Sequence, residues 1–135
     1  MSLHAALRGA LTACLRQDAG LAALPVPPAI HDGAPRAAAH PFIEIGRIET
    51  RLLAATPLEG EVSQVEILVH SRKAARGEAA AILDGARAAL SGLGAHLSGH
   101  LLINAGDPET RLERLSDGRT WRGRLRLRVV TEPAG

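Results

Sequence analysis

The chain has 135 residues, a formal net charge of +2 and 46% hydrophobic residues, which fits one folded domain and excludes a disordered chain. Phe42 and Trp121 are its only aromatic residues, so it lacks the platforms on which single-stranded nucleic acids stack. Cys14 is the only cysteine, which excludes an internal disulfide and a cysteine-based metal cluster, and no apolar run reaches the roughly 18 residues of a membrane span.

The first segment predicts an amphipathic helix. Apolar residues recur at helical spacing from Leu3 to Leu15, Ser2 can cap the start, and Gly20 is expected to end the helix. Cys14 lies on the apolar stripe of this helix, where a thiol is usually buried and inert. Three prolines, at positions 25, 27 and 28, then hold the chain extended.

Strands are expected next. Residues 29–31 predict a short strand, and the Pro41 that follows the next loop is expected to open an edge strand over residues 42–48. Residues 51–60 contain a proline and a glycine and predict a break. Residues 61–70 alternate strongly and predict a central strand.

The second half predicts a helix, a strand and a hairpin. Ser71 can cap a helix whose apolar stripe runs to Leu90, and the glycines at 77 and 85 suggest close packing of this helix against the sheet. Glycines at 92 and 94 are expected to end it. Residues 100–104 predict a strand, and residues 110–115 and 121–131 predict a hairpin around Asp117 and Gly118.

These elements predict an α+β fold for one domain spanning residues 1–135. Its sheet is expected to have about four to five strands, mostly antiparallel or mixed, with two main helices packed on it.

The last predicted strand alternates between two kinds of residue. Its apolar and small side chains face one side of the sheet, and its arginines face the other. One interpretation is an arginine ladder that contacts nucleic-acid phosphates, and the other is a solvated sheet face. The four arginines are Arg122, Arg124, Arg126 and Arg128.

The predicted hairpin helps to decide between these interpretations. A loop at residues 117–118 would place Glu113 opposite Arg122, Arg111 opposite Arg124, and Glu109 opposite Arg126. A ladder neutralised in this way is a poor phosphate clamp, because nucleic-acid binders need unpaired basic clusters. Arg124 is the residue left without a partner, so it is the one available to a neighbouring subunit.

The sequence carries no recognisable chemical site. His31 and Asp32, together with the histidines at 70, 96 and 100, match no zinc or H-E-x-x-H spacing. The chain has no G-x-S-x-G elbow and no glycine-rich loop that precedes a helix. We therefore expect no catalytic residue, metal or cofactor, and a structural protein in place of an enzyme.

Five stretches carry a resemblance to a known family. They are residues 17–21, 30–35, 40–46, 65–90 and 121–132, where the order of helix, loop, strand and hairpin is similar to that of phage tail-completion, or tail-terminator, proteins. The family occurs in long-tailed phages, prophages and gene transfer agents. His31 and His70 stand where the family often has an aromatic residue.

The resemblance implies a structural subunit made in the bacterial cytoplasm and assembled into a virion or virion-like particle. Such proteins form a ring, usually of six copies, at the head-proximal end of the tail tube, where they stop polymerisation and join tail to head. The implied partners are further copies of the chain, the major tail tube protein and a head–tail connector or stopper protein. DNA passes through the ring without sequence-specific binding. No membrane is involved.

The resemblance also implies contact surfaces. The candidates for the subunit interface are strand edges, the arginine strand and the 51–60 segment, with the residues Arg122, Arg124, Arg126, Arg128, Leu53, Pro57 and Glu59. Two alternatives remain open: another head–tail component, such as a stopper or minor tail protein, and a small nucleic-acid-binding module.

Overall fold

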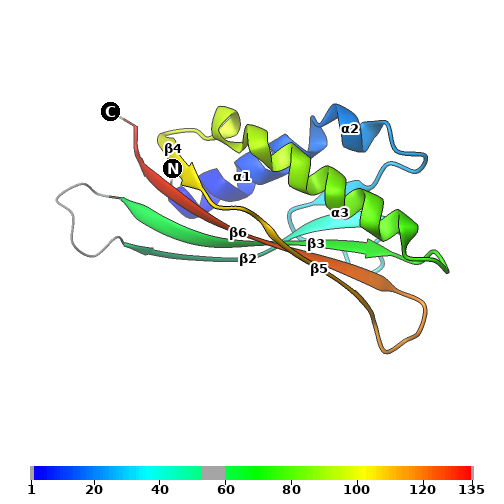
Figure 1. Cartoon of the computed structure of the whole chain (residues 1–135). Helices are drawn as coiled ribbons and strands as arrows, with labels where there is room; N and C mark the ends of the chain where they lie inside the picture. The colour runs from blue at the N-terminus through cyan, green and yellow to red at the C-terminus, as the bar shows by residue number, and fades with distance from the viewer. Residues whose placement is uncertain (1, 53–59, 135) are drawn as a thin grey trace.

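A six-stranded mixed sheet carries the helices on one of its faces (Figure 1). The computed structural model describes residues 2–52 and 60–134. The strands are β1 (Ala29–His31), β2 (Phe42–Leu52), β3 (Glu61–Ser71), β4 (His100–Ala105), β5 (Glu109–Arg114) and β6 (Trp121–Pro133). Their order is β1-β2-β3-β6-β4, and β5 also pairs with β6. The α+β class is therefore confirmed, with six strands in place of four or five.

Helix α1 (Leu3–Arg16) forms where the apolar spacing predicts it. The Ser2 hydroxyl accepts a hydrogen bond from the Ala5 amide at 3.2 Å, which caps the start. The helix ends before Gly20, because Asp18 caps a second short helix, α2 (Ala19–Ala22), through the Leu21 amide at 2.9 Å. Gly20 thus lies inside α2 and does not terminate α1.

Helix α3 (Gly77–Ala89) begins six residues after Ser71, which is the last residue of β3. The Ser71 backbone is paired opposite Trp121, and its hydroxyl donates to Glu78 at 2.6 Å, so the predicted cap is wrong. The helix continues as the 3₁₀ segment η1 (Leu90–His96) through the glycines that were expected to end it.

The two glycines of α3 also differ from expectation. A Cβ at Gly85 would lie 2.7 Å from Leu21 Cδ2, so Gly85 allows close packing of α3 against α2. A Cβ at Gly77 would meet nothing within 4 Å. Neither glycine therefore reflects close packing against the sheet.

Strand β2 lies between β1 and β3 at its start and is not an edge strand there. Its residues 42–44 pair in parallel with β1, and its whole length pairs antiparallel with β3, with a bulge between Ile45 and Ile48. Pro41 stands just before this doubly paired segment, and its carbonyl accepts from the Ala29 amide at 3.3 Å. Arg51 and Leu52 belong to the strand and not to the predicted break.

Strands β4 and β5 follow one another along the same edge of β6. β4 pairs with residues 129–133 and β5 with residues 121–126, both antiparallel. Between them, the Gly106 amide donates to the Arg128 carbonyl at 2.9 Å, which holds the connection against β6. The β5–β6 hairpin extends away from the helices (Figure 1).

The core lies between the helices and one face of the sheet. It is built from aliphatic side chains of α1, α3, η1, β2, β3 and β6. Cys14 connects α1 to α3 within the helical layer, since its Sγ donates to the Ala89 carbonyl at 3.0 Å. Among the fully buried large side chains are Leu7, Leu11, Leu15, Ile43, Ile67, Ile82, Leu93 and Leu125.

Candidate interaction surface

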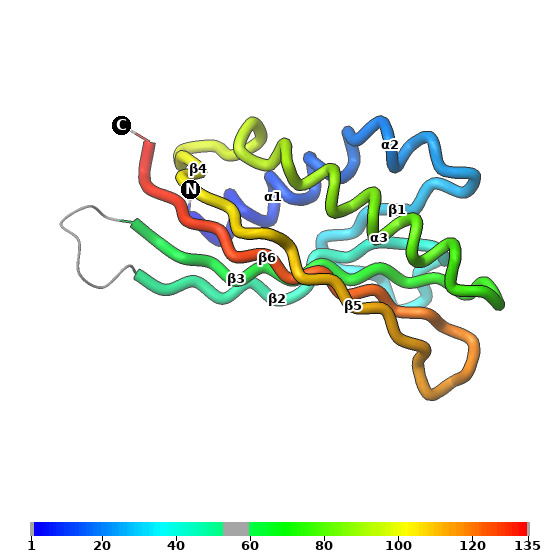
Figure 2. Tube along the Cα trace, in the orientation of Figure 1, coloured from blue at the N-terminus to red at the C-terminus, as the bar shows by residue number. Residues whose placement is uncertain are grey.

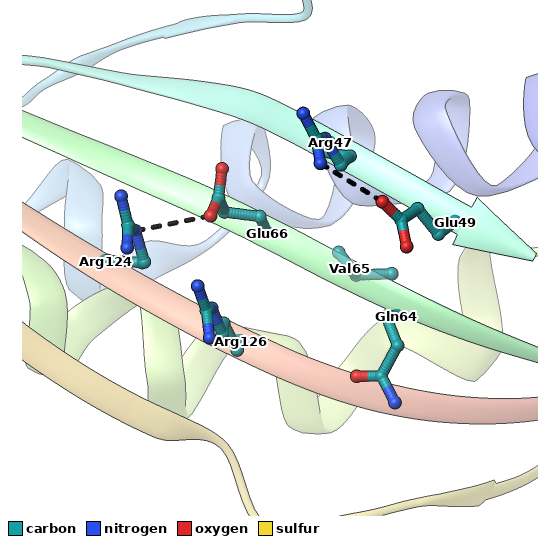
Figure 3. Close-up of a pocket in the computed structure, with 7 residues that line it drawn as sticks. All are labelled: Arg47, Glu49, Gln64, Val65, Glu66, Arg124 and Arg126. Carbon is teal, nitrogen blue, oxygen red and sulfur yellow. Dashed lines mark hydrogen bonds and ion pairs between the residues drawn. The ribbon is translucent and has the colours of Figure 1, made fainter.

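The sheet face that points away from the helices carries many charged side chains. We call it the open face. It is formed by the outward side chains of β2, β3, β5 and β6, and Figure 3 shows its centre. Its charged members include Glu44, Arg47, Glu49, Arg51, Glu66, Glu109, Arg111, Glu113, Arg122, Arg124, Arg126 and Arg128.

The arginine strand has the alternation that the sequence predicts. On β6, Gly123, Leu125, Leu127 and Val129 are buried, and the four arginines between them face outward. Arg126 and Arg128 are exposed, whereas Arg122 and Arg124 are half-buried. The half-buried pair are the two arginines that lie beside carboxylates, Arg122 beside Glu113 and Arg124 beside Glu66.

The predicted hairpin register is confirmed. Glu113 lies opposite Arg122, Arg111 opposite Arg124 and Glu109 opposite Arg126. The Arg122 guanidinium donates twice to Glu113 Oε1, at 2.6 and 3.2 Å. This hydrogen bond lowers the pKa of Glu113 below its usual value, so the pair is ionised at neutral pH.

Arg124 is not the unpaired member of the ladder. Its Nε lies 3.2 Å from Glu66 Oε2 on β3, although the N–H does not point at the oxygen well enough for a hydrogen bond. Figure 3 shows this ion pair. The expectation of a free Arg124 considered only the hairpin and missed the strand on the other side of β6.

Arg126 and Arg128 are the arginines left over. No carboxylate among residues 2–52 and 60–134 lies within ion-pair distance of either side chain. Arg126 lines a shallow polar groove of about 530 Å³ whose other lining includes Gln64, Glu66 and Arg124. Their exposed guanidinium groups are within reach of a partner.

The groove suits a protein surface better than a small ligand. It is open and polar, and Arg126 is its one charged lining residue without an ion pair in the described part of the chain, since Arg47 lies 3.2 Å from Glu49 and Arg124 lies 3.2 Å from Glu66. Small-molecule sites are usually enclosed and apolar, with a few converging polar groups. The other predicted interface residues, Leu53, Pro57 and Glu59, lie outside the described residues.

A cluster of histidines around Phe42 marks one end of the open face. The rings of Phe42 and His70 stack at 4.4 Å, and His31 and His40 meet Phe42 edge-on. His70 Nε2 lies 2.9 Å from Glu44 Oε1. Burial, with Arg72 and His70 nearby, lowers the pKa of His40, so this ring is neutral at pH 7. The histidines thus cover Phe42.

The remaining candidates for chemistry are used in packing. Asp32 accepts from Arg8 at 2.6 Å and is not paired with His31. Within residues 2–52 and 60–134, no three His, Cys, Asp or Glu side chains are placed so that they could hold one metal ion. None of the helices in that part of the chain has the length and hydropathy needed to cross a membrane.

The chain is similar to known proteins both in its sequence family and in its structure. A family model described as "Tail completion protein gp17" matches residues 9–132. A chain from the virion of a native gene transfer agent particle has a similar structure, with a TM-score of 0.73 and 23% identical residues. The match covers 97% of this chain and 98% of that chain, and at this identity it concerns the fold. No curated protein matches in sequence.

Proposed function

The chain belongs to the tail completion protein gp17 family, and from this premise we propose that it terminates the tail tube of a phage or phage-like particle. The observation that carries the proposal is the family match over residues 9–132, which spans nearly all of the α+β fold. The fold shared with a chain of a gene transfer agent virion supports the same assignment.

The subunit acts as part of a ring, with six copies as the expected number, at the head-proximal end of the tube. There it stops polymerisation and provides the surface that joins the head. A ring follows when a heterologous contact between identical chains closes by rotation. The shallow, polar groove supports a role in packing between proteins, because it lacks the shape of a ligand site.

The partners are further copies of the chain, the major tail tube protein and a head–tail connector or stopper protein. DNA passes the ring without sequence-specific binding. The ion pairs of Arg122 with Glu113 and of Arg124 with Glu66 support this, because paired arginines hold phosphates weakly. The chain is made in the bacterial cytoplasm and is built into the particle.

The predicted interface residues remain candidates under this function. Arg126 and Arg128 are favoured over Arg122 and Arg124, because their guanidinium groups are exposed and have no carboxylate partner within the described chain. Leu53, Pro57 and Glu59 follow β2 directly and stay in the proposal as contacts to the tube or to a neighbour.

The experiment is deletion of the gene in the producing strain, followed by electron microscopy of the particles. We expect tails of uncontrolled length and heads without tails, and restoration by the gene supplied in trans. Tails of normal length that fail to attach to heads would instead indicate a stopper or another connection protein. Normal, joined particles would contradict any essential role in the tail.

A further inference from the structure

Both edges of the sheet are open at the same end of the molecule. β4 is the last strand on one side, and β2 beyond Glu44 is the last on the other, since β1 covers only residues 42–44. Figure 2 shows both strands reaching the end opposite the β5–β6 turn. Within the described residues, no strand pairs with either edge there.

Arg8 closes the first part of the free edge of β2. Its guanidinium donates to the carbonyls of Ile45 and Gly46, both at 3.1 Å, and to Asp32 just after β1. The backbone groups next to the end of β1 are therefore satisfied within the chain. Residues 47–52 of β2 are the part of this edge that remains available.

The free edge of β4 has none of the usual protection. Exposed edge strands commonly carry charges or a proline, which prevent pairing with another chain. β4 has the sequence HLLINA, with no proline and no Asp, Glu, Lys or Arg. Its Leu101 and Ile103 are 49% and 54% exposed.

Exposed apolar side chains gather at these two edges. Four large hydrophobic residues of the described chain are exposed, and three of them lie on the free edges: Leu52 at 70%, Leu101 and Ile103. The fourth, Val26, lies in the proline-containing loop after α2. Exposed apolar side chains gain free energy when a partner covers them and removes them from water.

The two edges also lie at the same level along the strands. Leu52 pairs with Glu61, Glu61 with Thr131, and Thr131 with Leu102. In the same way, Arg51 is aligned with Asn104 across the sheet, through Val62 on β3 and Val130 on β6. The three steps across the sheet are antiparallel, so β4 runs opposite to β2.

From these observations we infer that residues 102–105 of β4 of one copy pair antiparallel with residues 50–52 of β2 of the next copy, so that the sheet continues across the subunit boundary. Rotation about a ring axis preserves the direction of each strand relative to that axis, which gives the antiparallel sense. Because the two edges lie at the same level, neighbouring copies join without a shift along the strands. A closed ring requires that there be no such shift. The inference rests on the proposed ring.

Cysteine pairs test the joint directly. With the levels kept, Asn104 of one copy faces Arg51 of the next, so the Arg51→Cys, Asn104→Cys double variant should form disulfides between copies in assembled particles. Non-reducing gels should show a ladder of covalent oligomers up to the ring. Each single variant, and the double variant Arg51→Cys, Arg111→Cys with its second cysteine on β5, should give no ladder.

A charge on the edge tests the same joint without a disulfide. Ile103→Lys should abolish the oligomer, so that light scattering gives the mass of one chain, while circular dichroism stays that of the folded protein. Val26→Lys adds the same charge to the exposed loop residue and should leave the oligomer intact. Both substituted side chains are exposed, so neither change disturbs the core.

The outcomes separate the joint from the function. If Ile103→Lys still forms rings and the Arg51→Cys, Asn104→Cys variant gives no ladder, this joint is overturned and tube termination still stands. If the ladder forms but deletion of the gene leaves tail length unchanged, the joint is supported and the proposed function is contradicted. Chains that stay monomeric both alone and on tail tubes overturn both.

Discussion

Asp117 organises the turn between β5 and β6. Its Oδ1 accepts from the amides of Arg119 and Thr120 at 2.8 and 2.9 Å, and its Oδ2 accepts from the Thr120 hydroxyl at 2.7 Å. These hydrogen bonds stabilise the ionised carboxylate. They hold the hairpin in the register that places Glu113 beside Arg122.

The Thr120 and backbone hydrogen bonds lower the pKa of Asp117 from its ordinary 3.8 to about 2. A lowered native pKa stabilises the fold above the ordinary value, and this contribution is lost as the pH falls from 3.8 toward 2. Carboxyl NMR titration should find the midpoint near 2 in the wild type. Thr120→Val should raise it toward 3.8, and Thr110→Val should leave it unchanged. A wild-type midpoint at the ordinary value would contradict the described turn.

Cys14 should be unreactive in the folded chain. Burial, with a smaller contribution from Asp18, raises the pKa of its thiol above 9.0, and little thiolate forms at neutral pH. Labelling by a thiol reagent should be about 10³-fold or more slower in buffer than in denaturant, since reaction requires opening of the core. A cysteine introduced by Val26→Cys is the exposed control. Equal rates at the two positions would contradict burial of Cys14.

The partners of Arg122 and Arg124 differ in whether the sequence predicts them. The partner of Arg122 could be predicted, because a two-strand register follows from the turn at Asp117. The partner of Arg124 could not, because Glu66 reaches it from β3, which the sequence does not place beside β6. Pairing across a sheet requires the strand order, and one sequence does not contain it.

At the scale of elements, Arg8 connects α1 to the start of the sheet. It is 23% exposed and makes four hydrogen bonds, two of them to the Ile45 and Gly46 carbonyls. Arg8→Ala should lower the free energy of unfolding by about 2 kcal/mol, because these carbonyls lose their donors. Arg16→Ala removes a single bond, to Ile30, and should cost about 1 kcal/mol. Urea unfolding that finds Arg8→Ala no more damaging than Arg16→Ala would refute this role.

The packing of α3 on α2 can be tested with two glycines. Gly85→Ala places a Cβ 2.7 Å from Leu21, which is buried, so the change should destabilise the protein by about 1–3 kcal/mol. Gly9 is inside α1, where an added Cβ would meet nothing within 4 Å, and Gly9→Ala should stabilise the protein by about 0.5–1 kcal/mol. Thermal unfolding measures both. Stabilisation by both changes would mean that α2 and α3 are not in close contact.

Most elements could be predicted because their periodicity is strong. α1 and the alternation of β6 follow from spacing alone. The start of α3 could not be predicted, because Ser71 has the same type as a helix cap but is held in β3 by its pairing with Trp121. The prediction that Gly20 ends α1 was also wrong, because Asp18 caps a new helix, α2, that contains this glycine.

At the scale of the whole molecule, the layers follow from the sequence and the edges do not. An aliphatic core between helices and sheet was expected from the apolar stripes. The placing of β4 and β5 on one edge of β6 depends on tertiary pairing, as does the parallel addition of β1. These pairings decide which edges stay open, and so which surfaces can join copies.

The most direct test is an electron cryomicroscopy reconstruction of the joint between head and tail in intact particles. The proposed function predicts copies of this chain in a closed ring at the head-proximal end of the tube, touching the last tube subunits on one side and a head protein on the other. Density for this chain at the distal tip of the tail, or as isolated copies that do not encircle the tube, would contradict it.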